Sequence, residues 1–295
     1  MTGIVVLGGA RMDLVAEADR APEPGESVPG RVFRTVPGGA GVNQAVAAAR
    51  AGADTALIGA VGSDDFGAAL RHTLEASGVD TDLLRTLPGP SGTGHLVVDG
   101  EGRTTAVTVP GANAAVTFLA PGDETLIATA GTLLLPLGIP LSAALDGALA
   151  ARRHGVRTVL APALDQHLPP ELLDATDLLL APEPTAAALT GTADPRAAAG
   201  ALLRRVPAVV VLRGPAGCLY AARGAETLTV PASPVPTVDP LGTGDAFAGA
   251  LAVALGEGVP AGTALHRAVT AAALCGGTPG AATSMPYRPE IDNAS

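Results

Sequence analysis

The sequence contains no tryptophan and no lysine, and aromatic residues make up only 2% of its 295 positions. A hydrophobic core therefore has to be built mainly from alanine, valine and leucine, within a hydrophobic fraction of 47%. No basic block and no mixed basic and aromatic patch occurs, and the net charge is −10. These features argue against a nucleic-acid partner.

Long hydrophobic runs are also missing. The run Leu133–Leu137 is far too short to span a bilayer. The segment Met1–Leu7 lacks the basic and apolar regions of a signal peptide. Cys218 and Cys275 lack the spacing of metal ligands, which leaves either two reduced thiols or one disulfide. We therefore expect a cytoplasmic protein that binds no membrane.

What the sequence does contain is an alternation of short apolar runs and helical stretches. At this length the chain can form one large α/β domain or two ordinary ones. Unbroken runs such as Ile4–Leu7 and Thr55–Val61 are typical of buried parallel strands. Further strands are expected at Thr132–Leu137, Arg157–Ala161, Leu178–Leu180, Ala208–Arg213 and Cys218–Ala222, and helices at Leu141–His154, Ala197–Arg205, Ala246–Leu255 and Gly262–Gly276. The pattern predicts a doubly wound α/β fold, a mostly parallel sheet flanked by helices.

Two regions depart from this pattern. In about 14–36 and 94–110, apolar and polar residues alternate and turn residues interrupt them. This is typical of antiparallel strands with one solvated face, such as Ser27–Val36 and a hairpin of His95–Val98 with Thr104–Val109. We expect these regions to form a small β-sheet lid on a single domain that covers 1–295.

The stretch Asp239–Asp245, with the sequence Asp-Pro-Leu-Gly-Thr-Gly-Asp, places two carboxylates around a glycine turn before a helix. The backbone freedom of Gly242 and Gly244 allows N–H groups at the helix start to converge on an anion. Asp245 could accept a proton from a substrate hydroxyl beside that anion, as in phosphoryl transfer. Taken alone, the pattern is more typical of an ordinary loop-to-helix junction than of a site.

Other candidate residues follow predicted strands or glycine turns. Arg11 and Asp13 come after the first strand, at the carboxyl end where open α/β sheets bind ligands. Asp13 could bind sugar hydroxyls or cap a loop, and Asn43 could bind a ligand or lie in a glycine-rich connector. Arg213 and Gly214 could border nucleotide phosphates or form a tight turn.

Five motifs occur in one order along the chain. They are Gly8–Asp13, Gly38–Ala45, Gly59–Gly67, Pro110–Asn113 and Asp239–Phe247. This series, over about residues 4 to 288, resembles the ribokinase-like (PfkB) carbohydrate kinases, with the ribokinases as the nearest branch. The first βα turn lacks the G-x-G-x-x-G pattern of dinucleotide-binding oxidoreductases, which disfavours that class.

The resemblance implies a kinase that transfers a phosphoryl group from ATP, with Mg²⁺, to a primary hydroxyl of a sugar or sugar-like molecule. It implies that Asp245 is the catalytic base and that the turn Gly242, Thr243 and Gly244 is the anion hole. A homodimer formed through the lid is also implied. The remaining positions that the resemblance indicates are Asp13, Arg11, Gly39, Ala40 and Asn43 for the substrate, Arg213, Gly214 and Gly217 for the nucleotide, and Asp239 and Ser284 for a monovalent cation such as K⁺.

Several positions differ from the family pattern. Arg11 and Ala40 stand where ribokinases have Asn and Lys, and Gly138 stands where they have a sugar-contacting Glu. The family's Asn-x-x-Glu motif, which organises magnesium, corresponds to Pro182–Thr185. Proline offers no donor and threonine is a poor ligand for a hard cation, so Glu183 is the one carboxylate left there for magnesium.

Two functions remain open. An active kinase with an altered pocket would use the permanently charged fork of Arg11 to bind a substrate that carries a carboxylate or phosphate. A degenerate kinase would bind a sugar or a nucleotide with little turnover, because it lacks residues that organise magnesium. The intact Asp245 and its anion-hole turn favour the active kinase.

Overall fold

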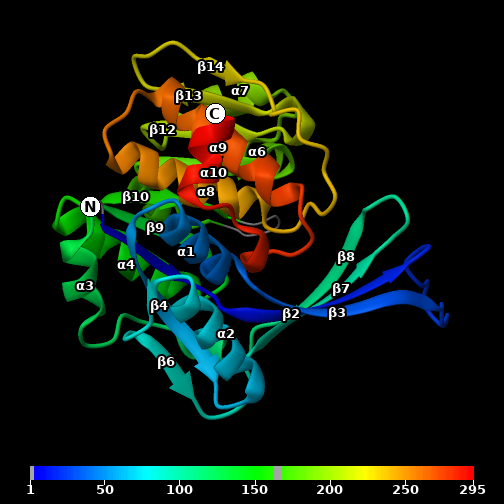
Figure 1. The fold of residues 1–295 in the computed structure, drawn as a ribbon. Helices are drawn as coiled ribbons and strands as arrows, with labels where there is room; N and C mark the ends of the chain where they lie inside the picture. Colours follow the sequence, from blue (N-terminus) through cyan, green and yellow to red (C-terminus); the bar gives the residue numbers. More distant parts are fainter. Residues whose placement is uncertain (1–2, 163–167) are drawn as a thin grey trace.

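A ten-stranded, mostly parallel sheet runs through the body of the protein (Figure 1). The computed structural model describes residues 3–162 and 168–295, so the first two residues of the segment Met1–Leu7 lie outside the described residues. The strand order is β14-β13-β12-β11-β10-β9-β1-β4-β5, with β6 beside β4. Strand β13 pairs antiparallel with both β12 and β14, and the other described pairings of this sheet are parallel. The strands are β1 (Gly3–Gly8), β4 (Asp54–Gly62), β5 (Val79–Asp80), β6 (Leu84–Leu87), β9 (Thr132–Leu137), β10 (Arg157–Leu160), β11 (Leu178–Pro182), β12 (Ala208–Leu212), β13 (Cys218–Ala222) and β14 (Leu228–Val230).

Helices cover both faces of this sheet. One face packs against α1 (Ala40–Arg50), α2 (Asp65–Ala76), α8 (Thr243–Gly256), α9 (Ala261–Gly276) and α10 (Arg288–Ala294). The other packs against α3 (Asp123–Thr129), α4 (Leu141–Arg153), α5 (Pro170–Asp174), α6 (Glu183–Thr190) and α7 (Pro195–Leu202). Short 3₁₀ turns occupy Gly111–Ala115, Gly214–Ala216 and Ala282–Ser284. Within the described ranges, none of the helices is long and apolar enough to cross a membrane.

Strand β1 illustrates how the sequence produces these two layers. Ile4 and Val6 belong to the core under α1 and α8, whereas Val5 and Leu7 belong to the core under α4. Successive side chains of a strand point to opposite faces, so a strand covered on both faces has to be apolar throughout. The predicted doubly wound α/β fold is confirmed.

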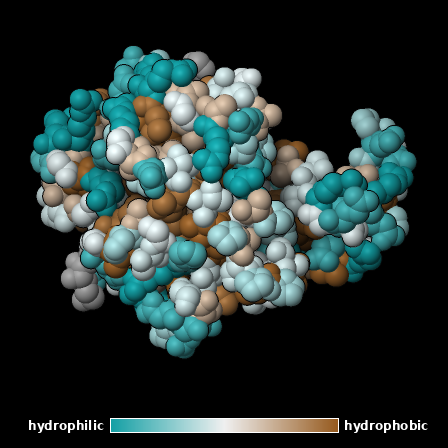
Figure 2. Space-filling view, turned by 90° about the horizontal axis from the view of Figure 1, so that it is seen from above, coloured by the Kyte–Doolittle hydropathy of each residue, from teal (hydrophilic) through white to brown (hydrophobic). Residues whose placement is uncertain are grey.

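A second, four-stranded sheet projects from the body (Figures 1 and 2). We call it the lid sheet; its strands are β2 (Arg11–Ala18), β3 (Gly30–Gly38), β7 (Gly92–Val98) and β8 (Thr104–Val109), in the order β3-β2-β7-β8. The expected antiparallel pairing holds for β2 with β3 and for β7 with β8, but β2 and β7 pair in parallel. Strand β2 begins at Arg11, and only Gly9 and Ala10 separate it from the end of β1. Arg11 and Asp13 therefore lie on a lid strand, and not on a loop.

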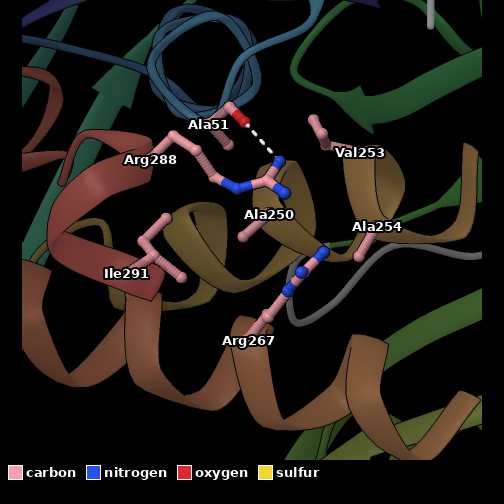
Figure 3. A pocket seen from close by; sticks show the side chains of 7 residues that line it. All are labelled: Ala51, Ala250, Val253, Ala254, Arg267, Arg288 and Ile291. Carbon is pink, nitrogen blue, oxygen red and sulfur yellow. Dashed lines mark hydrogen bonds between the residues drawn. The ribbon is translucent and has the colours of Figure 1, made fainter. Parts of the chain in front are cut away.

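Two arginines attach the C-terminal helix α10 to the body (Figure 3). Arg288 of α10 donates from Nη1 to the backbone oxygen of Ala51 at 3.3 Å, and Arg267 of α9 lies 3.8 Å from Oδ1 of Asp292 on α10. The pocket that Figure 3 shows between them has a volume of about 10 Å³. This is the space of about one water molecule, so the pocket is a packing gap and not a ligand site.

The two cysteines are free and buried, Cys218 on β13 and Cys275 on α9. The disulfide that the sequence left open is therefore not formed. Burial raises the pKa of each thiol to about 11.

Candidate active site

The candidate site lies at the carboxyl end of β1, between its neighbours β9 and β4. In sequence, the chain extends the sheet from β1 first toward β4 and later toward β9, and ligands of open α/β sheets bind at such a reversal. The backbones that leave β1 and β9 approach closely, since a Cβ on Gly9 would overlap the carbonyl of Gly138. Leu137 beside them has φ 65°, the one positive value of a non-glycine residue in the described ranges. Such backbone strain is common at functional sites.

Two helices begin at this crevice after a glycine. Gly39 precedes α1 with φ 84°, and Gly242 precedes α8 with φ 78°. A Cβ on Gly39 would lie 2.9 Å from the backbone nitrogen of Arg11, so only glycine fits there. Neither helix start has a side-chain cap in the described structure. The N–H of Gly41 donates to the backbone oxygen of Gly9 at 3.1 Å, and that of Thr243 donates to the backbone oxygen of Pro240 at 3.4 Å. The remaining N–H groups of the two first turns could donate to an anion.

Close packing of α1 against α8 places side chains from the two helices together. A Cβ on Gly249 of α8 would lie only 2.6 Å from the Cβ of Ala47 on α1, so the helices touch through small residues. Asn43 and Asp245 lie four positions before this contact on their own helices. Residues four apart lie on one face of a helix. The side chains of Asn43 and Asp245 therefore project toward each other, one helical turn before the contact between Ala47 and Gly249.

Asp245 accepts hydrogen bonds from two amide side chains of α1. Asn43 Nδ2 lies 2.9 Å from Oδ2, and Gln44 Nε2 lies 3.0 Å from Oδ1. Burial raises the pKa of Asp245; the hydrogen bonds from Gln44 and Asn43 and the charge of Arg11 oppose this rise, and the charge of Asp13 adds to it. A fixed carboxylate with a raised pKa suits a general base.

The amide oxygens of Asn43 and Gln44 are buried and accept no hydrogen bond from the described residues. Buried polar atoms in native proteins normally have a partner, and in a binding site the missing partner is often the ligand. Donor groups such as sugar hydroxyls could satisfy both oxygens beside Asp245.

Asp13 lies almost completely buried at the base of the lid sheet. Arg11 donates from Nε to its Oδ1 at 2.6 Å. Burial raises the pKa of Asp13, and the charge and the hydrogen bond of Arg11 counteract the rise. A Cβ on Gly38 or on Gly94 would overlap the carboxylate oxygens, so glycine on both neighbouring strands makes room for this side chain. The pair offers a ligand both an acceptor and a positive charge.

Asp239 has three nitrogen donors around its buried carboxylate. The backbone N–H of Leu241 donates to Oδ1 at 3.0 Å, and that of Gly280 donates to Oδ2 at 3.0 Å. Arg34, on lid strand β3, also donates to Oδ2, from Nη2 at 2.8 Å. The carboxylate is therefore already neutralised by a side chain of the protein.

This arrangement does not fit the monovalent cation expected at Asp239 and Ser284. Such a cation needs several oxygen ligands that face it, whereas Asp239 faces N–H donors and a guanidinium. The hydroxyl of Ser284 donates to the backbone oxygen of Ala281 at 3.0 Å and lies 3.3 Å from the sulfur of Cys275. We therefore derive no step through a bound monovalent cation.

A cavity of about 480 Å³ opens beside the turn that precedes Asp245. Thr243 and Gly244 line one part of it, Gly214 and Gly217 line another, and most of the remaining lining is apolar. An apolar cavity next to an uncapped helix start suits a ring attached to phosphate groups. Of the residues predicted for a nucleotide, the two glycines thus lie in this cavity.

Arg213 instead forms an ion pair with the residue predicted for magnesium. Its Nε lies 3.1 Å from Oε1 of Glu183, which is the first residue of α6. The hydroxyl of Thr185 is buried and has no hydrogen-bond partner among the described residues. Within residues 3–162 and 168–295, no group of three or more His, Cys, Asp or Glu residues could hold a metal ion.

The structure brings together most residues predicted for the site and adds three. Asp13, Arg11, Gly39, Ala40, Asn43, Gly242, Thr243, Gly244 and Asp245 lie on β2 and at the starts of α1 and α8. The three additions are Gln44, Arg34 and Asn113, whose side chain exchanges hydrogen bonds with the backbone of Ala10 at 2.9 and 2.7 Å. Gln44 stands inside the sequence motif Gly38–Ala45, and Asn113 ends the motif Pro110–Asn113. Arg34 carried no local signal, because only the folded lid brings it near Asp239.

Known proteins resemble the chain over nearly its whole length. A family model described as pfkB family carbohydrate kinase matches residues 1–288. The ribokinase of Bacillus subtilis (strain 168) is 37% identical over 295 residues, which cover 99% of each chain. The ribokinase of Mus musculus is 33% identical over 304 residues, covering 98% of this chain and 93% of its own. The structure of Arabidopsis thaliana ribokinase complexed with ribose and ATP has a TM-score of 0.92 and 30% identity, and the match covers 100% of this chain and 99% of that chain.

Proposed function

The chain belongs to the pfkB family of carbohydrate kinases, and on that premise we propose that it transfers the γ-phosphoryl group of ATP to a primary hydroxyl of a sugar or sugar-like molecule. The observation that carries the proposal is Asp245, held by Asn43 and Gln44 at the uncapped start of α8. This arrangement combines a proton acceptor with an anion-binding turn, which are the two groups that phosphoryl transfer needs from a protein.

In the proposed reaction, Asp245 accepts the proton of the substrate hydroxyl while the hydroxyl oxygen forms a bond to the γ-phosphorus. The bond between that phosphorus and the bridging oxygen breaks, and ADP leaves with the electron pair. The N–H groups of Gly242, Thr243 and Gly244 stabilise the negative charge on the transferred group. Asn43 and Gln44 keep the carboxylate oriented toward the hydroxyl.

The cavity beside the turn is the place that we assign to the nucleotide. Its apolar lining accepts the base, and Thr243 and Gly244 lie at the end where the phosphates meet α8. The complex of Arabidopsis thaliana ribokinase with ribose and ATP supports the choice of ATP as the nucleotide.

Magnesium fits this site only as an ion that the nucleotide carries. Mg²⁺ keeps several waters and is usually bound by one or two carboxylates together with substrate phosphates, so it needs no cage of protein ligands. Glu183 is the carboxylate that we assign to it, through Oε2, because Arg213 binds Oε1. When bound, Mg²⁺ would neutralise charge on the phosphates.

For the substrate we propose a sugar derivative with an acidic group. The described contacts of Arg11 use only Nε, toward Asp13, so both Nη groups remain for a carboxylate or phosphate. Asp13 and the free oxygens of Asn43 and Gln44 accept hydrogen bonds from hydroxyls. Neutral pentoses that clearly outperform acidic sugars would contradict this part of the proposal.

We also propose a homodimer formed through the lid sheet. Phe33, Val107 and Val109 are 65%, 64% and 46% exposed. The strand register places all three on the face opposite Asp13. Phe33 lies on one edge strand of the lid sheet and the two valines lie on the other, so exposed apolar side chains flank this face on both sides. A second copy of the lid packed across the face would cover them.

The deciding experiment measures ATP consumption with a panel of sugars, sugar acids and nucleosides. Wild type should turn over at least one of them, Asp245→Asn should lose that turnover, and Asp65→Asn should keep it, because Asp65 is an exposed aspartate in the first turn of α2. The alternative function, binding without turnover, draws support from the paired Glu183 and the missing carboxylate at Thr185. Thermal shifts with sugars or ATP but no turnover would favour that alternative.

A further inference from the structure

We infer that Arg34 supplies the fixed positive charge at Asp239, so that the phosphoryl transfer proposed above proceeds without a bound monovalent cation. The inference rests on the proposed function, because it concerns the charge beside the turn that receives the phosphoryl group. It assigns a positioning role to a lid residue that the sequence motifs do not include.

The ion pair joins two parts of the molecule that are 205 positions apart in the sequence. Arg34 lies on β3 opposite Val15 of β2, a residue with no exposed surface, so this face of the strand points inward. The side chain of Arg34 is 24% exposed, and that of Asp239 is 6% exposed. The contact is therefore largely shielded from solvent. Two opposite charges attract each other more strongly in such a shielded position than on an open surface.

The position of Asp239 explains why a positive charge is needed there. Its Oδ1 accepts the N–H of Leu241, one residue before Gly242, so the carboxylate is fixed next to the anion-hole turn. An unpaired carboxylate at this place would repel the phosphate and would itself be costly to bury. A charged partner at Asp239 removes both problems.

Arg34 is suited to be that partner. Its guanidinium is always protonated in proteins, and the lid strand holds it 2.8 Å from Oδ2 of Asp239. The Nε atom is also near a second acidic residue, 3.5 Å from Oε1 of Glu17 on β2. With Arg34 at Oδ2 and backbone N–H groups of Leu241 and Gly280 completing the shell, a free cation finds no place at this carboxylate.

The test compares wild type, Arg34→Gln and Arg31→Gln in a buffer with tetramethylammonium as the sole monovalent cation, before and after K⁺ is added. Arg31 is the matched control, an exposed arginine on the same strand that pairs with Asp19 at 2.8 Å. Wild type and Arg31→Gln should show the same kcat/KM with and without K⁺. Arg34→Gln should lose at least about tenfold in kcat/KM without K⁺, and K⁺ or guanidinium ion should restore most of it.

A second readout separates failure of this inference from failure of the proposed function. The melting temperature of Arg34→Gln should rise with K⁺ over tetramethylammonium, since an ion that binds only the folded state stabilises it. Wild type should show no such rise, and this holds even if no substrate is ever turned over.

Three results would overturn the inference. The first is a wild-type protein that K⁺ activates or stabilises. The second is an Arg34→Gln variant that matches wild type without K⁺. The third is a loss of activity in this variant that neither K⁺ nor guanidinium ion restores, because Arg34 would then hold the lid without supplying the charge.

Discussion

Gln44 Nε2 donates to Oδ1 of Asp245 at 3.0 Å, although 201 positions separate the two residues. Gln44 lies on α1 and Asp245 lies in the first turn of α8. The hydrogen bond therefore depends on the packing of two helices and links the proposed catalytic base to the first half of the chain.

Replacing Gln44 by methionine should move the acidic limb of the pH–rate profile to higher pH. The hydrogen bond from Gln44 lowers the pKa of Asp245 against the effect of burial, so its loss lets that pKa rise further. A base with a higher pKa is protonated over more of the acidic range and cannot accept a proton there. The measurement is kcat/KM against pH. An unchanged profile would contradict the role of Gln44. The control is Asp245→Asn, because the residual rate of this variant should show no acidic limb.

Replacing Gly242 by alanine should reduce both stability and activity. Its φ of 78° is unfavourable for residues with a Cβ, which predicts a loss of about 1–2 kcal/mol in the free energy of unfolding. The new Cβ would also lie 3.0 Å from Cε of Met285 and disturb the anion-hole turn. Gly258→Ala is the control, because it has φ 74° and no atom within 4 Å of the added Cβ. Urea unfolding should show a loss in both variants, whereas kcat should fall only in Gly242→Ala.

Phe33→Asp should convert the proposed dimer into a monomer. The substitution puts a charge on the outer face of the lid sheet, where Phe33 is 65% exposed. Phe118→Asp, at a residue 62% exposed outside the lid sheet, should leave the dimer intact. Size-exclusion chromatography with light scattering gives the molecular mass in solution. A monomeric wild type, or a dimeric Phe33→Asp, would refute dimerisation through this face.

Iodoacetamide should modify neither cysteine of the native protein at neutral pH. Both thiols are buried, and a pKa of about 11 keeps Cys218 and Cys275 protonated. Since the thiolate is the reactive form, alkylation should require unfolding. Mass spectrometry should find both cysteines modified in urea. Modification of either residue in the native protein would show that its environment is more open than described.

The sequence predicted the buried elements most accurately. The strands Thr132–Leu137 and Cys218–Ala222 were predicted with both ends correct, because a strand buried by its neighbours shows an unbroken apolar run. The short edge strands β5 and β14 were missed, since two or three residues show no period. The lid strand β3 begins at Gly30 and not at Ser27, since no residue pattern marks where pairing with β2 starts.

For the site, motifs placed Asp13, Asn43 and Asp245 in one crevice, because each follows a glycine turn or strand end whose position in the fold is known. The same reasoning missed Arg34, and it gave Gln44 no role although Gln44 stands inside the motif Gly38–Ala45. Their partners are set by how the lid meets the body and by how α1 meets α8, and neither relationship leaves a local pattern in the sequence.

The close contact between Ala47 and Gly249 also bears on how this kinase can evolve. Larger residues at either position would push α1 away from α8 and separate the amides of Asn43 and Gln44 from Asp245. Inherited change at this contact is therefore confined to the smallest side chains. Arg11 and Ala40, the positions proposed for the substrate, lie outside the contact, so they can change without moving the two amides away from Asp245.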